Sequence, residues 1–218
     1  MPRHFEHISK NNKRVKTAYV NLNLLIKDVQ KELKGDITFS HRPIGSYSRN
    51  MMTYDPKSNI GFDFDINIYP NYKKRVYNAK DTKEKFINAI NKHAKKYGYS
   101  PAENSTRVIT IKAKDTKNSK ILHSVDFAII RDCENDYGDY WQEYIRFNKK
   151  NNVYNWAKQD SDYEVFEERM DWIESEELME ELWEMYLRLK NNNKVESKHS
   201  IQLLTEAVDN IYHMYCNE

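Results

Sequence analysis

The chain has 218 residues, of which 39% are hydrophobic and 31% charged, a composition that excludes a disordered protein and predicts one or two closely joined domains. Its 35 Lys and Arg residues nearly balance 33 Asp and Glu residues, so the net charge gives no global reason to expect a nucleic-acid-binding protein. No apolar run reaches the roughly 18 residues of a transmembrane span, and the N-terminus lacks the apolar stretch of a signal peptide, so we expect a cytoplasmic protein.

The first quarter of the chain predicts a helix followed by a strand and a turn. Apolar residues recur at alternating intervals of four and three over residues 15–33, which indicates an amphipathic helix, and Gly35 is expected to end it as a C-terminal cap. A short strand is expected over residues 37–40. Pro43 and Gly45 then predict a turn.

The sequence GFDFDINIY at residues 61–69 alternates strictly between apolar and polar side chains. This alternation is typical of a strand whose two faces have different surroundings. We therefore expect a strand with one buried apolar face. Its other face carries Asp63, Asp65 and Asn67.

The middle of the chain predicts a helix, a hairpin and a further strand. Asp81, with a glutamate three residues later, resembles a capping box that opens the helix, and Gly98 stands at its expected end. Two strands, residues 107–114 and 120–130, flank a polar turn and suit a hairpin. Residues 144–147 have a weaker strand pattern.

The last quarter of the chain is expected to be helical. Apolar residues recur at helical spacing on an acidic background over residues 163–189, and again over residues 201–215. Ser175 is expected to be an N-cap between two of these helices, because its hydroxyl can accept an unpaired backbone N–H.

Three aspartates are candidate metal ligands. Asp63 and Asp65, two residues apart on one strand, point the same way and can bind one divalent cation, although such a pair alone is more often a solvated strand face. Asp126 lies in SVDFAII, a run too apolar for a solvent-exposed edge strand, where a carboxylate needs a partner or a metal. If the two strands are neighbours, the three carboxylates converge in a cluster that suits two-metal phosphoryl transfer.

A candidate phosphate-binding turn precedes these carboxylates. Gly45 permits close backbone approach, and backbone N–H groups with the Ser46 hydroxyl can donate to phosphate oxygens. Arg49 could add a charge-assisted contact. Ordinary turn chemistry explains a lone Gly-Ser pair equally well, so its position before the acidic strand is what favours nucleotide binding.

The segments GSYSRNMMTY, GFDFDINIY, RVITIKAK and HSVDFAII together resemble the nucleotidyltransferase superfamily with a polymerase-beta-like core. The likeness is closest to the branch containing oligoadenylate synthase, cyclic GMP-AMP synthase and related bacterial immune nucleotidyltransferases. It implies an α+β fold with a mixed-sheet catalytic core over residues 1–160, which includes the long N-terminal helix. A C-terminal helical lobe over residues 161–218 would close the nucleotide cleft.

The resemblance also implies roles for the core residues. Asp63 and Asp65 would bind both metal ions, which we expect to be Mg²⁺ or, in its place, Mn²⁺. Asp126 would bind the catalytic metal ion and help the acceptor hydroxyl lose its proton. Gly45 and Ser46 would contact the phosphates of the nucleoside triphosphate donor, for example ATP.

In the helical lobe, Lys190 and Ser200 are candidate donor contacts, and Arg188 is a rival of Lys190 for the phosphate. Two positions depart from the family pattern. Asn50 stands where such families often have glycine, and residues 54–60 lengthen the segment before the acidic strand.

The implied activity is transfer of a nucleoside monophosphate from a nucleoside triphosphate to a hydroxyl, with release of pyrophosphate. The acceptor stays open among a nucleotide, an RNA end, a protein side chain and a small drug, while the resemblance favours an oligonucleotide signal in defence against phage. One alternative is a toxin–antitoxin type enzyme that modifies a protein or transfer RNA partner. Another is a non-catalytic nucleotide-binding module, against which the presence of three mutually repelling acids argues.

Overall fold

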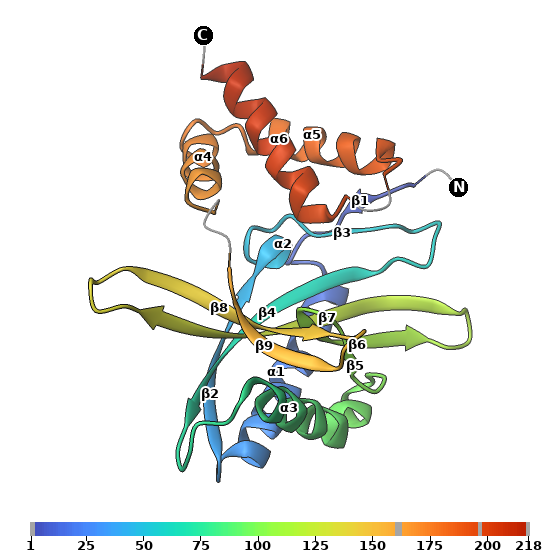
Figure 1. Ribbon diagram of the computed structural model, residues 1–218. Helices are drawn as coiled ribbons and strands as arrows, with labels where there is room; N and C mark the ends of the chain where they lie inside the picture. Colours follow the sequence, from blue (N-terminus) through green and yellow to red (C-terminus); the bar gives the residue numbers. More distant parts are fainter. Residues whose placement is uncertain (1–2, 160–162, 196–197, 217–218) are drawn as a thin grey trace. The chain divides into compact units, whose positions relative to one another are not determined.

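The computed structural model describes residues 3–159, 163–195 and 198–216 (Figure 1). By its internal contacts the chain forms two compact units. We call Ile8–Met52 together with Asn59–Gln159 the sheet unit. The helical unit comprises the rest: Met1–His7, Thr53–Ser58 and Asp160–Glu218.

A mixed sheet forms the centre of the sheet unit. Its two middle strands, β4 and β7, run parallel, and their outer neighbours are antiparallel to them. The strands follow the order β2 (Ile37–Ile44), β4 (Phe62–Tyr72), β7 (Lys120–Glu134), β6 (Val108–Asp115) and β5 (Glu103–Asn104). The mixed sheet and its accompanying helices confirm the predicted α+β class.

Strand β7 continues beyond this sheet into a second antiparallel ladder. Its residues 130–134 pair with β8 (Tyr140–Asn148), which pairs in turn with β9 (Val153–Lys158). The weak strand pattern at residues 144–147 is therefore the middle of a longer strand. Strand β9 was not predicted, because apolar residues are adjacent in its sequence, VYNWAK, and do not alternate with polar ones.

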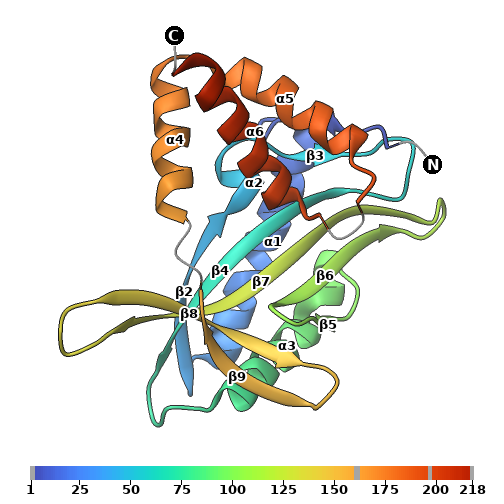
Figure 2. The ribbon, with the colours of Figure 1, turned by 45° about the horizontal axis from the view of Figure 1, so that its top comes forward.

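Helices α1 (Lys13–Leu33) and α3 (Ala79–Ala94) lie side by side on one face of the sheet (Figures 1 and 2). Their buried side chains, such as Leu22 and Phe86, are fully excluded from solvent. The apolar face of β4 packs against the same layer, and the Phe64 ring lies 5.8 Å from the Tyr19 ring of α1. The predicted buried face of this strand is confirmed.

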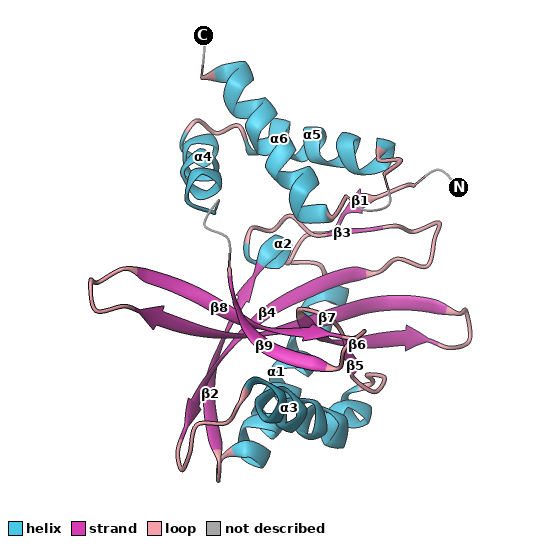
Figure 3. Cartoon of the chain, viewed as in Figure 1, coloured by secondary structure: helices cyan, strands magenta, loops and turns pink. Residues whose placement is uncertain are grey.

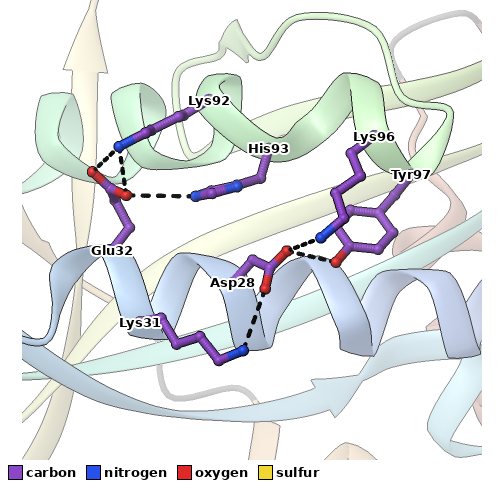
Figure 4. Close-up of polar contacts among 7 residues, drawn as sticks. All are labelled: Asp28, Lys31, Glu32, Lys92, His93, Lys96 and Tyr97. Atoms are coloured by element: carbon purple, nitrogen blue, oxygen red, sulfur yellow. Dashed lines mark hydrogen bonds and ion pairs between the residues drawn. The ribbon is translucent and has the colours of Figure 1, made fainter.

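Polar contacts fix α1 to α3 and to the 3₁₀ turn Lys95–Tyr97 that follows it (Figure 4). Asp28 accepts hydrogen bonds from Lys96 Nζ at 2.7 Å and from the Tyr97 hydroxyl at 2.6 Å. These two hydrogen bonds hold the pKa of Asp28 at about 2. One helical turn further on, Glu32 accepts from Lys92 Nζ at 2.7 Å.

Two predicted helix caps were wrong. Helix α1 ends at Leu33 with Lys34 as its C-cap, and the backbone of Gly35 does not enter the left-handed region that makes glycine a cap. Helix α3 is capped by Asn78, whose side-chain oxygen accepts from the Asp81 backbone N–H at 2.8 Å. Asp81 therefore lies in the first turn, where its negative charge suits the helix dipole. Gly98, with φ of 82°, closes the following 3₁₀ turn as expected.

Strand β2 is longer than predicted and continues through Pro43 to Ile44. Proline is tolerated here because β2 is an edge strand of the central sheet, where a missing N–H need not break a ladder bond. The turn therefore begins only at Gly45.

The helical unit consists mainly of α4 (Tyr163–Ser175), α5 (Met179–Asn192) and α6 (Ser200–Tyr215), as the cartoon in Figure 3 shows. Strands β1 (Glu6–His7) and β3 (Thr53–Tyr54) form a short ladder within it. The predicted N-cap at Ser175 was wrong, because its hydroxyl donates to the carbonyl oxygen of Trp172 at 2.7 Å and ends α4 instead. Among the described residues, no helix has the length and apolar character needed to cross a bilayer.

Candidate nucleotide and metal site

Asp65 on β4 and Asp126 on β7 are direct partners in the parallel ladder. Asp63 is likewise the partner of Ser124. These side chains lie on the sheet face opposite α1 and α3, because they alternate with the buried apolar residues of their strands. The neighbouring strands required by the sequence prediction are present, and we call this surface the carboxylate face.

Hydroxyl groups from neighbouring strands hold two of the carboxylates. The Ser124 hydroxyl donates to Asp63 Oδ1 across the parallel ladder. Thr110 lies opposite Asp126 in the antiparallel ladder, and its hydroxyl donates to Asp126 Oδ1 at 2.5 Å. Both contacts fix the orientation of a carboxylate.

Burial raises the pKa of Asp126, and the nearby negative charge of Asp63 raises it further. The Thr110 hydrogen bond and the positive charge of Lys112 act in the opposite direction, but the raised value shows that they do not fully compensate. A carboxylate in this state is stabilised by any cation that approaches it.

The chemistry of the donors fits magnesium, which prefers carboxylate oxygen ligands. As the side chains stand, no three His, Cys, Asp or Glu residues in the described part of the chain are arranged so that they could hold a metal ion together. Asp65 and Asp126 are neighbours in the ladder, whereas Asp63 accepts a hydrogen bond from Ser124. The predicted three-carboxylate metal site thus has the right donors, and its metal binding stays a proposal.

The Gly45 turn lies directly against one of these carboxylates. Gly45 opens the one-turn helix α2 (Gly45–Ser48) with φ of +64°, a left-handed conformation that favours glycine. A Cβ atom at this position would lie 2.4 Å from Asp65 Oδ2. Glycine is therefore required here for both the backbone conformation and the close approach.

The other turn residues surround Gly45. Ser46 is half-buried, and its carbonyl oxygen accepts from Met51 N at 2.7 Å, while Arg49 Nη1 donates to the Gly45 carbonyl at 3.4 Å. Asn50, where related families often have glycine, has φ of 55°. Asparagine is one of the few residues that adopt this conformation readily, which explains how the departure is tolerated.

The predicted donor contacts of the lobe lie in the helical unit. Lys190 is buried, and its ammonium donates to Thr53 Oγ1 at 2.5 Å and to the Tyr186 hydroxyl at 3.3 Å. Ser200 is the exposed first residue of α6. Arg188 is exposed and contacts the sulfur of Met185. Donor binding by these residues stays a prediction.

Sequence reasoning missed the contribution of the β5–β6 pair to the carboxylate face. Lys112 lies opposite Ser124, and its ammonium pairs with Glu103 at 2.8 Å. Thr110 lies on the same face. Alternation in RVITIKAK puts both residues on one side of the strand, but only the pairing of β6 with β7 shows that this side carries Asp126.

This arrangement of sheet, turn and acidic strands is a polymerase-beta-like nucleotidyltransferase fold, related to that of the cyclic GMP-AMP synthase-like bacterial enzymes. The chain is similar to the Vibrio cholerae cyclic AMP-GMP synthase DncV, with 15% identity and a TM-score of 0.51 over 90% of this chain and 54% of that one. The 3′-deoxy ATP bound form of the same enzyme is 14% identical with a TM-score of 0.52, over 91% of this chain and 52% of that one. Escherichia coli DncV bound to 3′-deoxy GTP is 15% identical with a TM-score of 0.52, over 90% of this chain and 54% of that one.

At these identities the likeness shows the fold alone, and it confirms the fold that the sequence motifs predicted. The chain spans about half the length of these solved structures. No protein-family model matches the sequence, and no curated protein sequence matches it.

Proposed function

We propose that the chain is a metal-dependent nucleotidyltransferase, which moves a nucleoside monophosphate from a nucleoside triphosphate to a hydroxyl acceptor. One observation carries the proposal: the Gly45 turn lies against Asp65, and Asp65 is the ladder partner of Asp126. The candidate phosphate-binding turn and a pair of acidic residues are thereby neighbours on the sheet. This is the arrangement that phosphoryl transfer needs.

The reaction forms a bond between the acceptor oxygen and the α-phosphorus, and it breaks the bond from that phosphorus to the pyrophosphate leaving group. Mg²⁺ or Mn²⁺ bound by Asp63, Asp65 and Asp126 would neutralise phosphate charge and lower the pKa of the acceptor hydroxyl. Backbone N–H groups and the hydroxyl at Gly45–Ser46 donate to the donor phosphates. Asp126 would also accept the proton of the acceptor hydroxyl.

The product we propose is an oligonucleotide or cyclic nucleotide signal made in the cytoplasm during defence against phage. In support, the similar solved structures include an enzyme described as a cyclic AMP-GMP synthase and forms bound to 3′-deoxy ATP and 3′-deoxy GTP. Lys190 and Ser200 would contact the donor from the helical unit. Modification of a protein or transfer RNA is the alternative outcome.

The test is incubation of the purified protein with each labelled nucleoside triphosphate and Mg²⁺ or Mn²⁺, followed by separation of the products. A new nucleotide species that disappears in Asp63→Asn supports the proposal. The matched control is Asp132→Asn, which removes an exposed aspartate further along β7 and should retain activity. Full activity of Asp63→Asn would overturn the proposal, and inactivity of the wild-type chain with every triphosphate would favour a macromolecular acceptor.

A further inference from the structure

A cavity of about 360 Å³ lies at the turn end of the β6–β7 hairpin. Three lysines from the two strands line it, together with two hydroxyl side chains of the connecting turn. These are Lys112, Lys114, Lys120, Thr116 and Ser119. The cavity therefore offers hydrogen-bond donors, most of them cationic.

This cavity adjoins the carboxylate face through Lys112. Lys112 is the ladder partner of Ser124, and Ser124 donates its hydroxyl to Asp63. Lys114 lies two residues further along β6, a step of about 7 Å on a strand. A ligand with its reacting hydroxyl near Asp126 and an anionic tail about 10 to 15 Å away would extend from the carboxylates into the cavity.

The cavity keeps a positive charge because its three lysines outnumber its single acidic residue, Asp115. Asp115 directs its carboxylate into its own turn, where it accepts from the backbone N–H groups of Lys117 at 3.1 Å and Asn118 at 3.2 Å. Lys114 makes no ion pair with another residue in the described part of the chain. Lys112 is held by Glu103, but a quarter of its side chain remains exposed.

We propose that this cavity is a polyphosphate subsite for the acceptor of the transfer reaction. Lysine ammonium groups with hydroxyl donors suit phosphate oxygens, and they give an uncharged drug or the hydroxyl side chain of a protein no comparable set of contacts. The assignment to the acceptor rests on the proposed function. The binding of a phosphate chain does not, because the cavity lies outside the carboxylates.

Binding of inorganic tripolyphosphate, measured by titration calorimetry in excess chelator and at low salt, tests the subsite without catalysis. The chelator removes divalent ions, so the carboxylates cannot contribute to binding. We expect Lys112→Gln/Lys114→Gln to bind at least about tenfold more weakly than the wild-type chain, as loss of charge-assisted contacts predicts. The matched control is Lys95→Gln/Lys150→Gln, which removes the same charge at exposed positions outside the cavity.

Glu103→Gln gives a change in the opposite direction, because it releases Lys112 from its ion pair. This variant should bind tripolyphosphate several-fold more tightly. If both double variants bound tripolyphosphate equally weakly, the loss would come from the lower net charge alone, and the proposed subsite would be overturned. Undetectable binding to the wild-type chain, or weaker binding to Glu103→Gln, would overturn it as well.

Competition identifies the source of the phosphate chain. Displacement of tripolyphosphate by GTP or ATP supports a mononucleotide acceptor. Displacement only by a short RNA with a 5′-triphosphate assigns the same subsite to an RNA end. If neither displaces it, the proposed acceptor role is wrong. Because this experiment needs no turnover, its outcome is independent of the test of the proposed function. Full activity of Asp63→Asn would overturn the proposed function, and tripolyphosphate binding that depends on Lys112 and Lys114 would still leave the phosphate site standing.

Discussion

Gly45 and Asp65 approach so closely that a single methyl group at Gly45 would lie 2.4 Å from the Asp65 carboxylate. The contact joins the turn after β2 to the acidic strand β4. Just before the turn, Ile44 of β2 is the ladder partner of Asp65. The backbone of the turn and the carboxylate are thereby held at a fixed separation. A donor phosphate chain bridging them would find both sides already positioned.

Gly45→Ala should therefore abolish nucleotidyl transfer. The added methyl group displaces Asp65, and the positive φ adds about 1 to 2 kcal/mol of backbone strain. Gly138→Ala is the matched control, because Gly138 also has positive φ but nothing lies within 4 Å of the position its Cβ would take. We expect both variants to lose unfolding free energy in urea, Gly45→Ala more than Gly138→Ala because of the added contact with Asp65, and only Gly45→Ala to lose activity. An active Gly45→Ala would show that the close approach is not needed.

Asp126→Asn should stabilise the protein at neutral pH in the presence of a chelator. The pKa of Asp126 is raised above its ordinary value of 3.8, so the folded state binds more protons than the unfolded state in the window above 3.8. The stability from this group is present below 3.8 and is lost as the pH rises through the folded pKa. We expect the melting temperature of Asp126→Asn to exceed that of the wild-type chain at pH 7, with a smaller difference at pH 4. A difference in melting temperature between the two proteins that is the same at pH 4 and pH 7 would contradict the raised pKa of Asp126.

Ser124→Ala should weaken metal binding, because Ser124 fixes the Asp63 carboxylate. Residues that orient ligands in this way typically account for about 10- to 100-fold in metal affinity. We expect Ser124→Thr, which keeps a hydroxyl, to bind Mn²⁺ more tightly than Ser124→Ala when free Mn²⁺ is followed by electron paramagnetic resonance. Equal affinity of the two variants would mean that the hydroxyl has no part in positioning Asp63.

The buried residue Lys83 of α3 should make the stability of the sheet unit depend on pH. It is 1% exposed, donates to the Ser105 carbonyl at 2.7 Å, and burial lowers its pKa to about 8 from 10.5. Between these values the unfolded state binds more protons, so the stability from this group rises as the pH increases from 8 to 10.5. Lys83→Met should flatten this rise in thermal unfolding curves, whereas exposed Lys95→Met should retain it. A rise that persists in Lys83→Met would assign it to another group.

The sequence allowed much of the fold to be predicted, because alternation and helical spacing are local signals. The buried face of β4 followed directly from GFDFDINIY, and the order of elements supported the family resemblance. Helix caps were less predictable, since Asn78 and Asp81 can both accept a backbone N–H and the choice between them depends on where the preceding chain turns. Pro43 was misleading because the sequence does not show that β2 is an edge strand.

The sequence predicted those site residues that stand out within a single strand, but not those that the pairing of strands brings to the site. The three aspartates could be named because each stands out within its own strand. Their partners Thr110 and Lys112 could not, because these lie 16 and 12 positions from the residues they face, Asp126 and Ser124. That relationship is set by the register of β6 against β7, including an irregularity near Ala113 that a pattern of alternation cannot reveal.

Pyrophosphate release from a nucleoside triphosphate in the presence of Mg²⁺ is the most direct measurement of the central claim. Wild-type protein and Asp126→Asn would be compared at equal concentration, with circular dichroism to verify that both are folded. We predict release by the wild-type chain and a loss of at least about 100-fold in the variant, because a direct ligand should matter more than the residues that orient it. Equal release by the two proteins would contradict the assignment of the carboxylate face as the catalytic site.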